Sequence, residues 1–161
     1  MSNRWDALGP QYAKLGLATS ADIIAARGIP VVIGPLLTSR SKVELRNRSL
    51  ANPGRLARAG VTIAITTDHP VVPIHFLAHQ AALAVKEGLD AGTALRALTI
   101  NPARIAGIAG RLGSIEAGKD ADLVIWSGDP LELRSRVQRA LIDGAEIYAR
   151  DGDQDRFADS W

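Results

Sequence analysis

Asp68 and His69 are the side chains in this sequence best suited to catalysis, because both come shortly after an apolar segment, separated from it only by Thr66 and Thr67. Residues 61–65 read Val-Thr-Ile-Ala-Ile, and this largely continuous apolar run predicts a strand that is buried on both faces. In parallel α/β sheets and barrels, ligands and catalytic groups lie at the carboxyl ends of the strands. A carboxylate at such an end can ligate a metal or act as a general base. The alternative is that Asp68 caps a helix that begins after Pro70.

The histidines are the next candidates for the site. His69 either contacts substrate beside Asp68 or is a loop residue without a function. His75 and His79 are four residues apart, so they share one face of a helix, and this spacing can chelate zinc. However, Phe76 follows His75 where a zinc protease would have its glutamate. We therefore expect the pair to belong to a polar stripe rather than to a metal site.

A basic segment follows a second predicted strand, residues 29–33, which ends at a Gly-Pro turn. The cations of this segment are Arg40, Lys42, Arg46 and Arg48. A solvated loop leading into a helix is the simplest interpretation. Because the segment follows a strand, Ser39 and Arg40 could instead reach the strand-end site and bind a substrate carboxylate.

Helices and strands alternate along the first part of the chain. The sequence predicts strands at residues 29–33 and 61–65, and helices at residues 21–27, 52–59, 74–87 and 91–99, with a short one after Pro102. Pro53 suits the first turn of its helix, where the missing N–H costs little, and Gly60 ends that helix. This alternation is typical of βα units with a parallel sheet.

The pattern changes to antiparallel β structure after Leu112. Strands are predicted at residues 123–126, 137–142 and 145–149. Asp143 and Gly144 form a strong signal for a two-residue hairpin turn between the last two strands. The remaining residues, 151–161, are acidic and polar, and we expect a flexible tail.

Composition narrows the class of protein. With 161 residues, 47% of them hydrophobic and 22% charged, the chain can form a buried core. A net charge of +2 and an aromatic content of 4% do not predict nucleic-acid binding. No apolar run approaches the roughly 18 residues that span a membrane. The absence of cysteine suits the cytosol, so we expect a cytoplasmic protein with neither nucleic acid nor membrane as a partner.

Three motifs in order resemble the carboxyl-terminal region of the amidohydrolase superfamily. They are the strand end TTDHP at residues 66–70, the Asn-Pro-Ala motif at residues 101–103 and the segment GSIEAGKDADLVI at residues 113–125. The closest branch is the one related to imidazolonepropionase, where stretches similar to VVIGPLLTSRSK, residues 31–42, also occur. The resemblance runs from about Gly28 to Gly144. Asn101 and residues 119–122 belong to these motifs and are predicted to have structural roles.

The resemblance implies an α/β fold and a hydrolase. Residues 1–110 would form the last βα units of a (β/α)8 TIM barrel, and residues 111–150 the last strands of a β-sandwich domain. The implied reaction is hydrolysis of a non-peptide C–N bond in a small cyclic or linear amide, by water activated at a divalent metal, zinc by expectation. Asp68 would be the metal ligand and proton shuttle, and His69, Arg40 and Ser39 would contact the substrate.

The chain also departs from this family. A complete barrel needs about 250 residues, so we expect a carboxyl-terminal portion of an enzyme. A His-x-His pair on the first barrel strand and the ligands of the middle strands are not recognisable in the sequence. Asp68 and His69 alone cannot bind zinc tightly, because catalytic zinc usually has three protein ligands. We therefore expect this chain alone to be inactive and either to share a metal with a missing barrel half or to hold none.

One further expectation follows from a partial barrel. Strands at the open edges of its sheet would expose unpaired N–H and C=O groups, so the chain should self-associate or pair with the missing half.

The alternative to the enzyme is a non-catalytic α/β fragment that is retained for binding or assembly.

Overall fold

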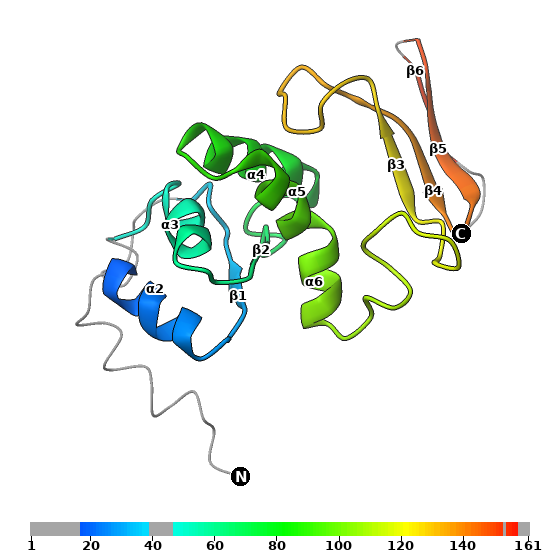
Figure 1. Ribbon diagram of the computed structural model, residues 1–161. Helices are drawn as coiled ribbons and strands as arrows, with labels where there is room; N and C mark the ends of the chain where they lie inside the picture. The colour runs from blue at the N-terminus through cyan, green and yellow to red at the C-terminus, as the bar shows by residue number, and fades with distance from the viewer. Residues whose placement is uncertain (1–16, 39–46, 153, 158–161) are drawn as a thin grey trace. The chain divides into compact units, whose positions relative to one another are not determined.

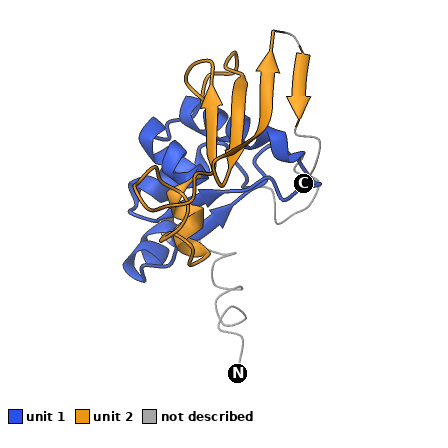
Figure 2. Ribbon diagram, turned by 90° about the vertical axis from the view of Figure 1, so that its right-hand side faces the viewer, with its two compact units in different colours: residues 1–98 blue, residues 99–161 orange. Residues whose placement is uncertain are grey.

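The computed structural model describes residues 17–38, 47–152 and 154–157, so Ser39 and Arg40 lie outside the described residues. The chain divides into two compact units, Met1–Leu98 and Thr99–Trp161 (Figure 2). No helix within the described ranges combines the length and the apolar character needed to cross a membrane.

The first unit alternates helices with two short strands (Figure 1). Its elements are α2 (Leu17–Ala26), β1 (Val31–Ile33), α3 (Asn52–Arg58), β2 (Ile63–Ile65), the 3-10 turn η2 (Ile74–Phe76), α4 (Leu77–Lys86) and α5 (Ala91–Leu98). Strands β1 and β2 pair in parallel, with Val31 opposite Ile63 and Ile33 opposite Ile65. The unit is therefore of the α/β class, as the sequence predicts. Closure of these strands into a barrel stays a prediction.

The core of the first unit is built from β2 and small residues of two helices. All three residues of β2 are buried, which agrees with the continuous apolar run in the sequence. Helices α4 and α5 pack against each other, and both contact β2. Ala81 and Ala84 of α4 and Ala94 and Ala97 of α5 are fully buried. Because alanine carries only a methyl group, the two helices can lie close together without cavities.

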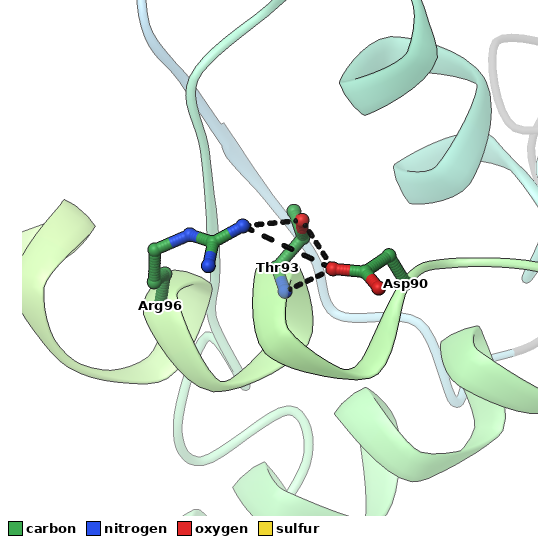
Figure 3. Close-up of polar contacts among 3 residues, drawn as sticks. All are labelled: Asp90, Thr93 and Arg96. Atoms are coloured by element: carbon green, nitrogen blue, oxygen red, sulfur yellow. Dashed lines mark hydrogen bonds and ion pairs between the residues drawn. The ribbon is translucent and has the colours of Figure 1, made fainter.

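Helix α5 begins with a side-chain cap (Figure 3). Oδ2 of Asp90 accepts hydrogen bonds from the backbone N–H and from the hydroxyl of Thr93, both at 2.8 Å. Nη2 of Arg96 donates to the Thr93 hydroxyl at 2.8 Å and lies 3.9 Å from Asp90 Oδ2. The Thr93 hydroxyl, the Thr93 N–H and then the Arg96 charge hold the pKa of Asp90 below its usual value. The cap is therefore strongest when Asp90 is ionised.

The second unit is a short helix followed by an antiparallel sheet. Its elements are α6 (Ile100–Ile105), β3 (Leu123–Trp126), β4 (Val137–Ile142), β5 (Ala145–Asp151) and β6 (Gln154–Phe157), and the strands lie in the order β3-β4-β5-β6. Asp143 and Gly144 have φ angles of 50° and 78°, which are the positive values that a two-residue hairpin turn needs. The predicted antiparallel strands and their hairpin are confirmed.

The segment between α6 and β3 is fixed by polar contacts. Ser114 donates a hydrogen bond to Oε1 of Glu116 at 2.6 Å, and Nζ of Lys119 lies 3.2 Å from the same oxygen. The Ser114 hydroxyl first, and then Lys119, lower the pKa of Glu116. A Cβ atom on Gly113 would lie 2.7 Å from the Ala103 Cβ of α6, so this segment passes close to the helix. These contacts support the structural role predicted for the motif.

Strand β6 forms where the sequence analysis expects a flexible tail. It pairs with β5, and Phe157 lies opposite Tyr148 with 5.2 Å between the ring centroids. The Tyr148 hydroxyl also donates a hydrogen bond to Oδ1 of Asp155 at 2.9 Å. Residues 154–157 therefore extend the sheet by one strand. The predicted domain boundary between residues 110 and 111 stays a prediction.

Candidate active site

Asp68 and His69 lie at the carboxyl end of β2. The Thr66 N–H donates to the Ile33 carbonyl oxygen at 3.1 Å, which continues the parallel pairing just beyond the two strands. Because β1 and β2 run in the same direction, their carboxyl ends lie at the same end of the sheet. Asp68 and His69 follow at this end, and both side chains are exposed. In α/β folds, ligands bind at the corresponding end of the sheet.

Asp68 is not a helix cap. The chain turns at residues 68–71, and the next helical segment, η2, begins only at Ile74. Its N-cap position is Pro73, with no side-chain hydrogen bond. Within the part of the chain that the structure describes, no group hydrogen-bonds or ion-pairs with the Asp68 carboxylate. The capping alternative is therefore wrong, because the turn separates Asp68 from the helix that it was expected to cap.

The backbone of Asp68 is held in a left-handed conformation, with φ at 51°. This conformation is uncommon for residues other than glycine, although aspartate adopts it more readily than most. The carbonyl oxygen of Asp68 accepts a hydrogen bond from the Val71 N–H at 2.8 Å. Its N–H donates to the Thr66 hydroxyl at 3.2 Å. The turn thus fixes the Asp68 backbone and leaves its carboxylate free to meet a ligand.

Gln80 of α4 connects the ends of both strands, and the sequence analysis missed it. Its side chain is fully buried. Oε1 accepts hydrogen bonds from the N–H groups of Leu36 and Leu37, the latter at 3.3 Å, and Nε2 donates to the Thr66 carbonyl oxygen at 3.3 Å. The sequence feature that could have pointed to Gln80 is its position beside Ala81, on the apolar face of the predicted helix. A polar residue there must find buried partners.

The loop after β1 is also bound by Arg48, the member of the basic segment that the structure describes. Its guanidinium donates to the Pro35 carbonyl oxygen. A cation therefore lies on the loop that follows β1. Ser39 and Arg40 stay predictions, since they lie outside the described residues.

His75 and His79 belong to an aromatic cluster around Phe76. The Phe76 ring centroid lies 4.4 Å from that of His75 and 5.5 Å from that of His79, edge-on to the latter. Among the described residues there is no group of three or more His, Cys, Asp or Glu side chains that could hold a metal ion. Both histidines therefore pack against Phe76, and the expectation that they form no metal site stays a prediction.

The family follows from a comparison of the whole chain with known proteins. A model of the amidohydrolase family matches residues 8–152. The chain belongs to this family. The resemblance found in the sequence motifs is therefore confirmed.

Relatives of this amidohydrolase chain include two differently named enzymes, a formamide deformylase and an imidazolonepropionase. An N-substituted formamide deformylase from Arthrobacter pascens is 31% identical over 161 residues, covering 89% of this chain and 29% of that protein. An imidazolonepropionase from Sphingopyxis alaskensis is 34% identical over 99 residues, covering 58% of this chain and 24% of that protein. The crystal structure of an amidohydrolase from Thermotoga maritima MSB8 is 47% identical with a TM-score of 0.79, covering 83% of this chain and 35% of that one. The chain thus spans about a quarter to a third of the length of these proteins.

Amidohydrolases are generally metal-dependent, and the described residues offer only part of a metal site. Asp68 provides an exposed carboxylate at a strand end, and His69 is its exposed neighbour. Catalytic zinc usually has three protein ligands, and no such group exists in residues 17–38, 47–152 and 154–157. The donor set described here therefore does not fit a complete metal centre.

Proposed function

We propose that this chain contributes the last βα units of an amidohydrolase barrel, within residues 1–110, and the last strands of its β-domain, within residues 111–150. The proposed reaction is hydrolysis of a non-peptide C–N bond in a small cyclic or linear amide, in the cytoplasm. The names of the formamide deformylase and the imidazolonepropionase among the relatives support this reaction class. The observation that carries the proposal is an exposed carboxylate, Asp68, at the carboxyl end of a buried parallel strand.

Asp68 is the proposed proton shuttle. Asp68 would also be one ligand of a divalent metal, zinc in this proposal, which would supply the Lewis acidity that lowers the pKa of a bound water to about 7. Asp68 accepts the proton that the attacking water loses as its oxygen adds to the amide carbon. Asp68 then gives this proton to the nitrogen as the C–N bond breaks, so that an acid and an amine leave. The remaining metal ligands come, in this proposal, from barrel strands outside the described residues.

His69, Arg40 and Ser39 are the proposed substrate contacts. His69 is exposed and adjacent to Asp68, which puts its imidazole within reach of a substrate that Asp68 contacts. Arg40 and Ser39 follow the loop that Gln80 and Arg48 bind at the end of β1. An arginine there would suit a substrate carboxylate, because its planar guanidinium binds carboxylates through two hydrogen bonds.

Asp68→Asn tests the proposal in an active form, in which the other barrel strands are joined to the chain or added as a second polypeptide. An asparagine cannot accept the proton, so kcat should fall by several orders of magnitude on a panel that includes N-substituted formamides. His69→Gln is the matched control, and it should raise KM more than it lowers kcat. Turnover near that of the wild type in a folded Asp68→Asn variant would remove Asp68 from the mechanism.

A non-catalytic α/β fragment is the second candidate function. The observation that favours it is the lack of a three-ligand group among the described residues. The two candidates differ in one measurable property. The enzyme gains metal-dependent amide hydrolysis when the remaining barrel strands are supplied, whereas a binding fragment gains none.

A further inference from the structure

Gln80 is a buried amide whose side-chain oxygen and nitrogen both have backbone partners. It is one of the largest side chains in the described residues with less than 2% exposure, and it is the polar one among them. An amide buried without hydrogen bonds destabilises a fold, because its donors and acceptor lose their bonds to water. Gln80 avoids this cost because both ends of its side chain are bonded. The partners therefore explain why a glutamine can occupy the apolar face of α4.

These partners lie on two separate segments. Leu36 and Leu37, whose N–H groups meet at Oε1, follow β1 and are more than forty positions before Gln80. Thr66, whose carbonyl oxygen receives the Nε2 donor, follows β2. One side chain thus ties the carboxyl ends of both parallel strands to α4. Neither a carboxylate nor an apolar residue of the same length can supply one acceptor and one donor at once.

Thr66 carries this connection on to Asp68. Its carbonyl oxygen accepts from Gln80, and its hydroxyl accepts from the Asp68 N–H at 3.2 Å. Any movement of the Thr66 peptide therefore moves the hydrogen bond that helps to hold Asp68 in its left-handed conformation. The geometry points to Gln80 as a positioning residue, which fixes the Asp68 turn relative to the loop after β1 without touching Asp68 itself. This inference gives a structural basis to the proposed function and rests on it for the role of Asp68.

The test uses backbone amide hydrogen exchange by NMR on the 161-residue chain, with no substrate or added metal. Gln80→Met removes all three hydrogen bonds of the side chain, and it should lower the protection factors of Leu36 and Asp68 by about tenfold or more. Leu89→Ala is the matched control, since Leu89 is buried just beyond the other end of α4 and lowers stability without touching Gln80. Equal losses of protection at Asp68 in both variants would overturn the inference.

Gln80→Glu distinguishes the hydrogen bond accepted from Leu36 from the one donated to Thr66. It also provides a second test if Gln80→Met does not fold. An ionised carboxylate still accepts from Leu36 but cannot donate to Thr66, so Leu36 should stay protected while Asp68 loses protection. When the pH falls through the pKa of the introduced carboxyl, its O–H can donate to Thr66, and protection at Asp68 should return. Protection at Asp68 that does not change with pH would contradict a role for the Thr66 bond.

An activity measurement then distinguishes this inference from the proposed function. In an active form, Gln80→Met should lower kcat more than it raises KM, and Leu89→Ala should not. If Gln80→Met loses amide protection at Asp68 without a change in kcat, Gln80 does not position Asp68 for catalysis. Asp68→Asn still tests separately whether Asp68 is the proton shuttle. If Asp68→Asn retains full turnover, the proposed function fails, and the exchange data alone decide whether Gln80 holds the turn.

Discussion

Gly34 lies against Thr66 where the chain leaves β1 and β2. A Cβ atom on Gly34 would come within 2.0 Å of the Thr66 carbonyl oxygen and 2.9 Å of its carbonyl carbon. That carbonyl oxygen also accepts the hydrogen bond from Gln80, so it has little freedom to move away. The contact therefore requires glycine, and it brings the loop after β1 against the segment that leads to Asp68.

Gly34→Ala should destabilise the first unit by about 2 to 3 kcal/mol, because overpacking against fixed backbone atoms forces the two strand ends apart. Urea unfolding monitored by circular dichroism measures the change. Gly92→Ala is the control within the same unit, because its Cβ would meet only the flexible ends of Arg96 and Asp90 at 3.4 Å. It should be neutral or slightly stabilising. A Gly34→Ala variant as stable as the wild type would mean that the strand ends can separate freely.

The purified chain should retain less than a stoichiometric amount of divalent metal after dialysis against a mild chelator. Asp68 is the one exposed carboxylate at the strand end that the family resemblance assigns to metal, and the described residues hold no three-ligand group. Elemental analysis by mass spectrometry gives the metal content. A full equivalent of retained zinc, lost in Asp68→Ala, would show that further ligands act with Asp68, and His69, His75 and His79 would be the first to test.

The cap of α5 should make stability depend on pH in the acidic range. The Thr93 hydroxyl, the Thr93 N–H and the Arg96 charge lower the pKa of Asp90 in the folded state. The stabilisation is therefore fully present above the pKa of Asp90 in the unfolded state, about 3.9. It is lost as the pH falls through the lower pKa that Asp90 has in the folded state. Free energies of unfolding, measured between neutral pH and about pH 2.5, should converge for the wild type and Asp90→Asn at the acidic end.

Thr93→Val provides the control for this prediction. Valine removes the hydroxyl, which is the largest cause of the lowered pKa, and keeps the backbone N–H that also bonds Asp90. The pH dependence should therefore shrink without disappearing. A constant difference between the wild type and Asp90→Asn across the pH range would show that ionised Asp90 gives the cap no added strength.

Local patterns in the sequence predicted most elements of this fold. The apolar run before Asp68 gave the buried strand β2, and the pair Asp143 and Gly144 gave the hairpin between β4 and β5. Both signals depend on residues that are adjacent in the chain. Strand β6 was missed because its four residues are exposed and carry no apolar alternation. Its pairing depends on β5, through contacts such as Tyr148 with Phe157.

The candidate site was predictable only in part, for a similar reason. The sequence located Asp68 at a strand end, but it could not decide between a free carboxylate and a helix cap. That choice depends on the turn at residues 68–71, which delays the helix until Ile74. Gln80 could not be assigned a role because its partners, Leu36 and Thr66, are distant in the chain. Only the folded arrangement brings the three together.

The last prediction concerns association of the chain with itself. Within the described residues the parallel sheet has two strands, and no third strand pairs with the outer edge of β1. An edge strand of this kind offers backbone N–H and C=O groups to another chain. Val32, in the middle of β1, has 55% of its surface exposed, and Val71 and Ile74 beyond β2 are exposed by 58% and 65%. A second copy could cover both the strand edge and these apolar side chains.

We therefore expect a dimer or a larger assembly at micromolar concentration, measured by light scattering after size exclusion. Val32→Lys should shift the population toward monomer, because a charged edge strand resists pairing with another chain. Ile115→Lys is the control: Ile115 is 88% exposed and belongs to the second unit, not to the unit that contains β1, so this variant should associate as the wild type does. A stable wild-type monomer would mean that the edge of β1 is already covered within the chain, and the open-barrel arrangement in the proposed function would have to be abandoned.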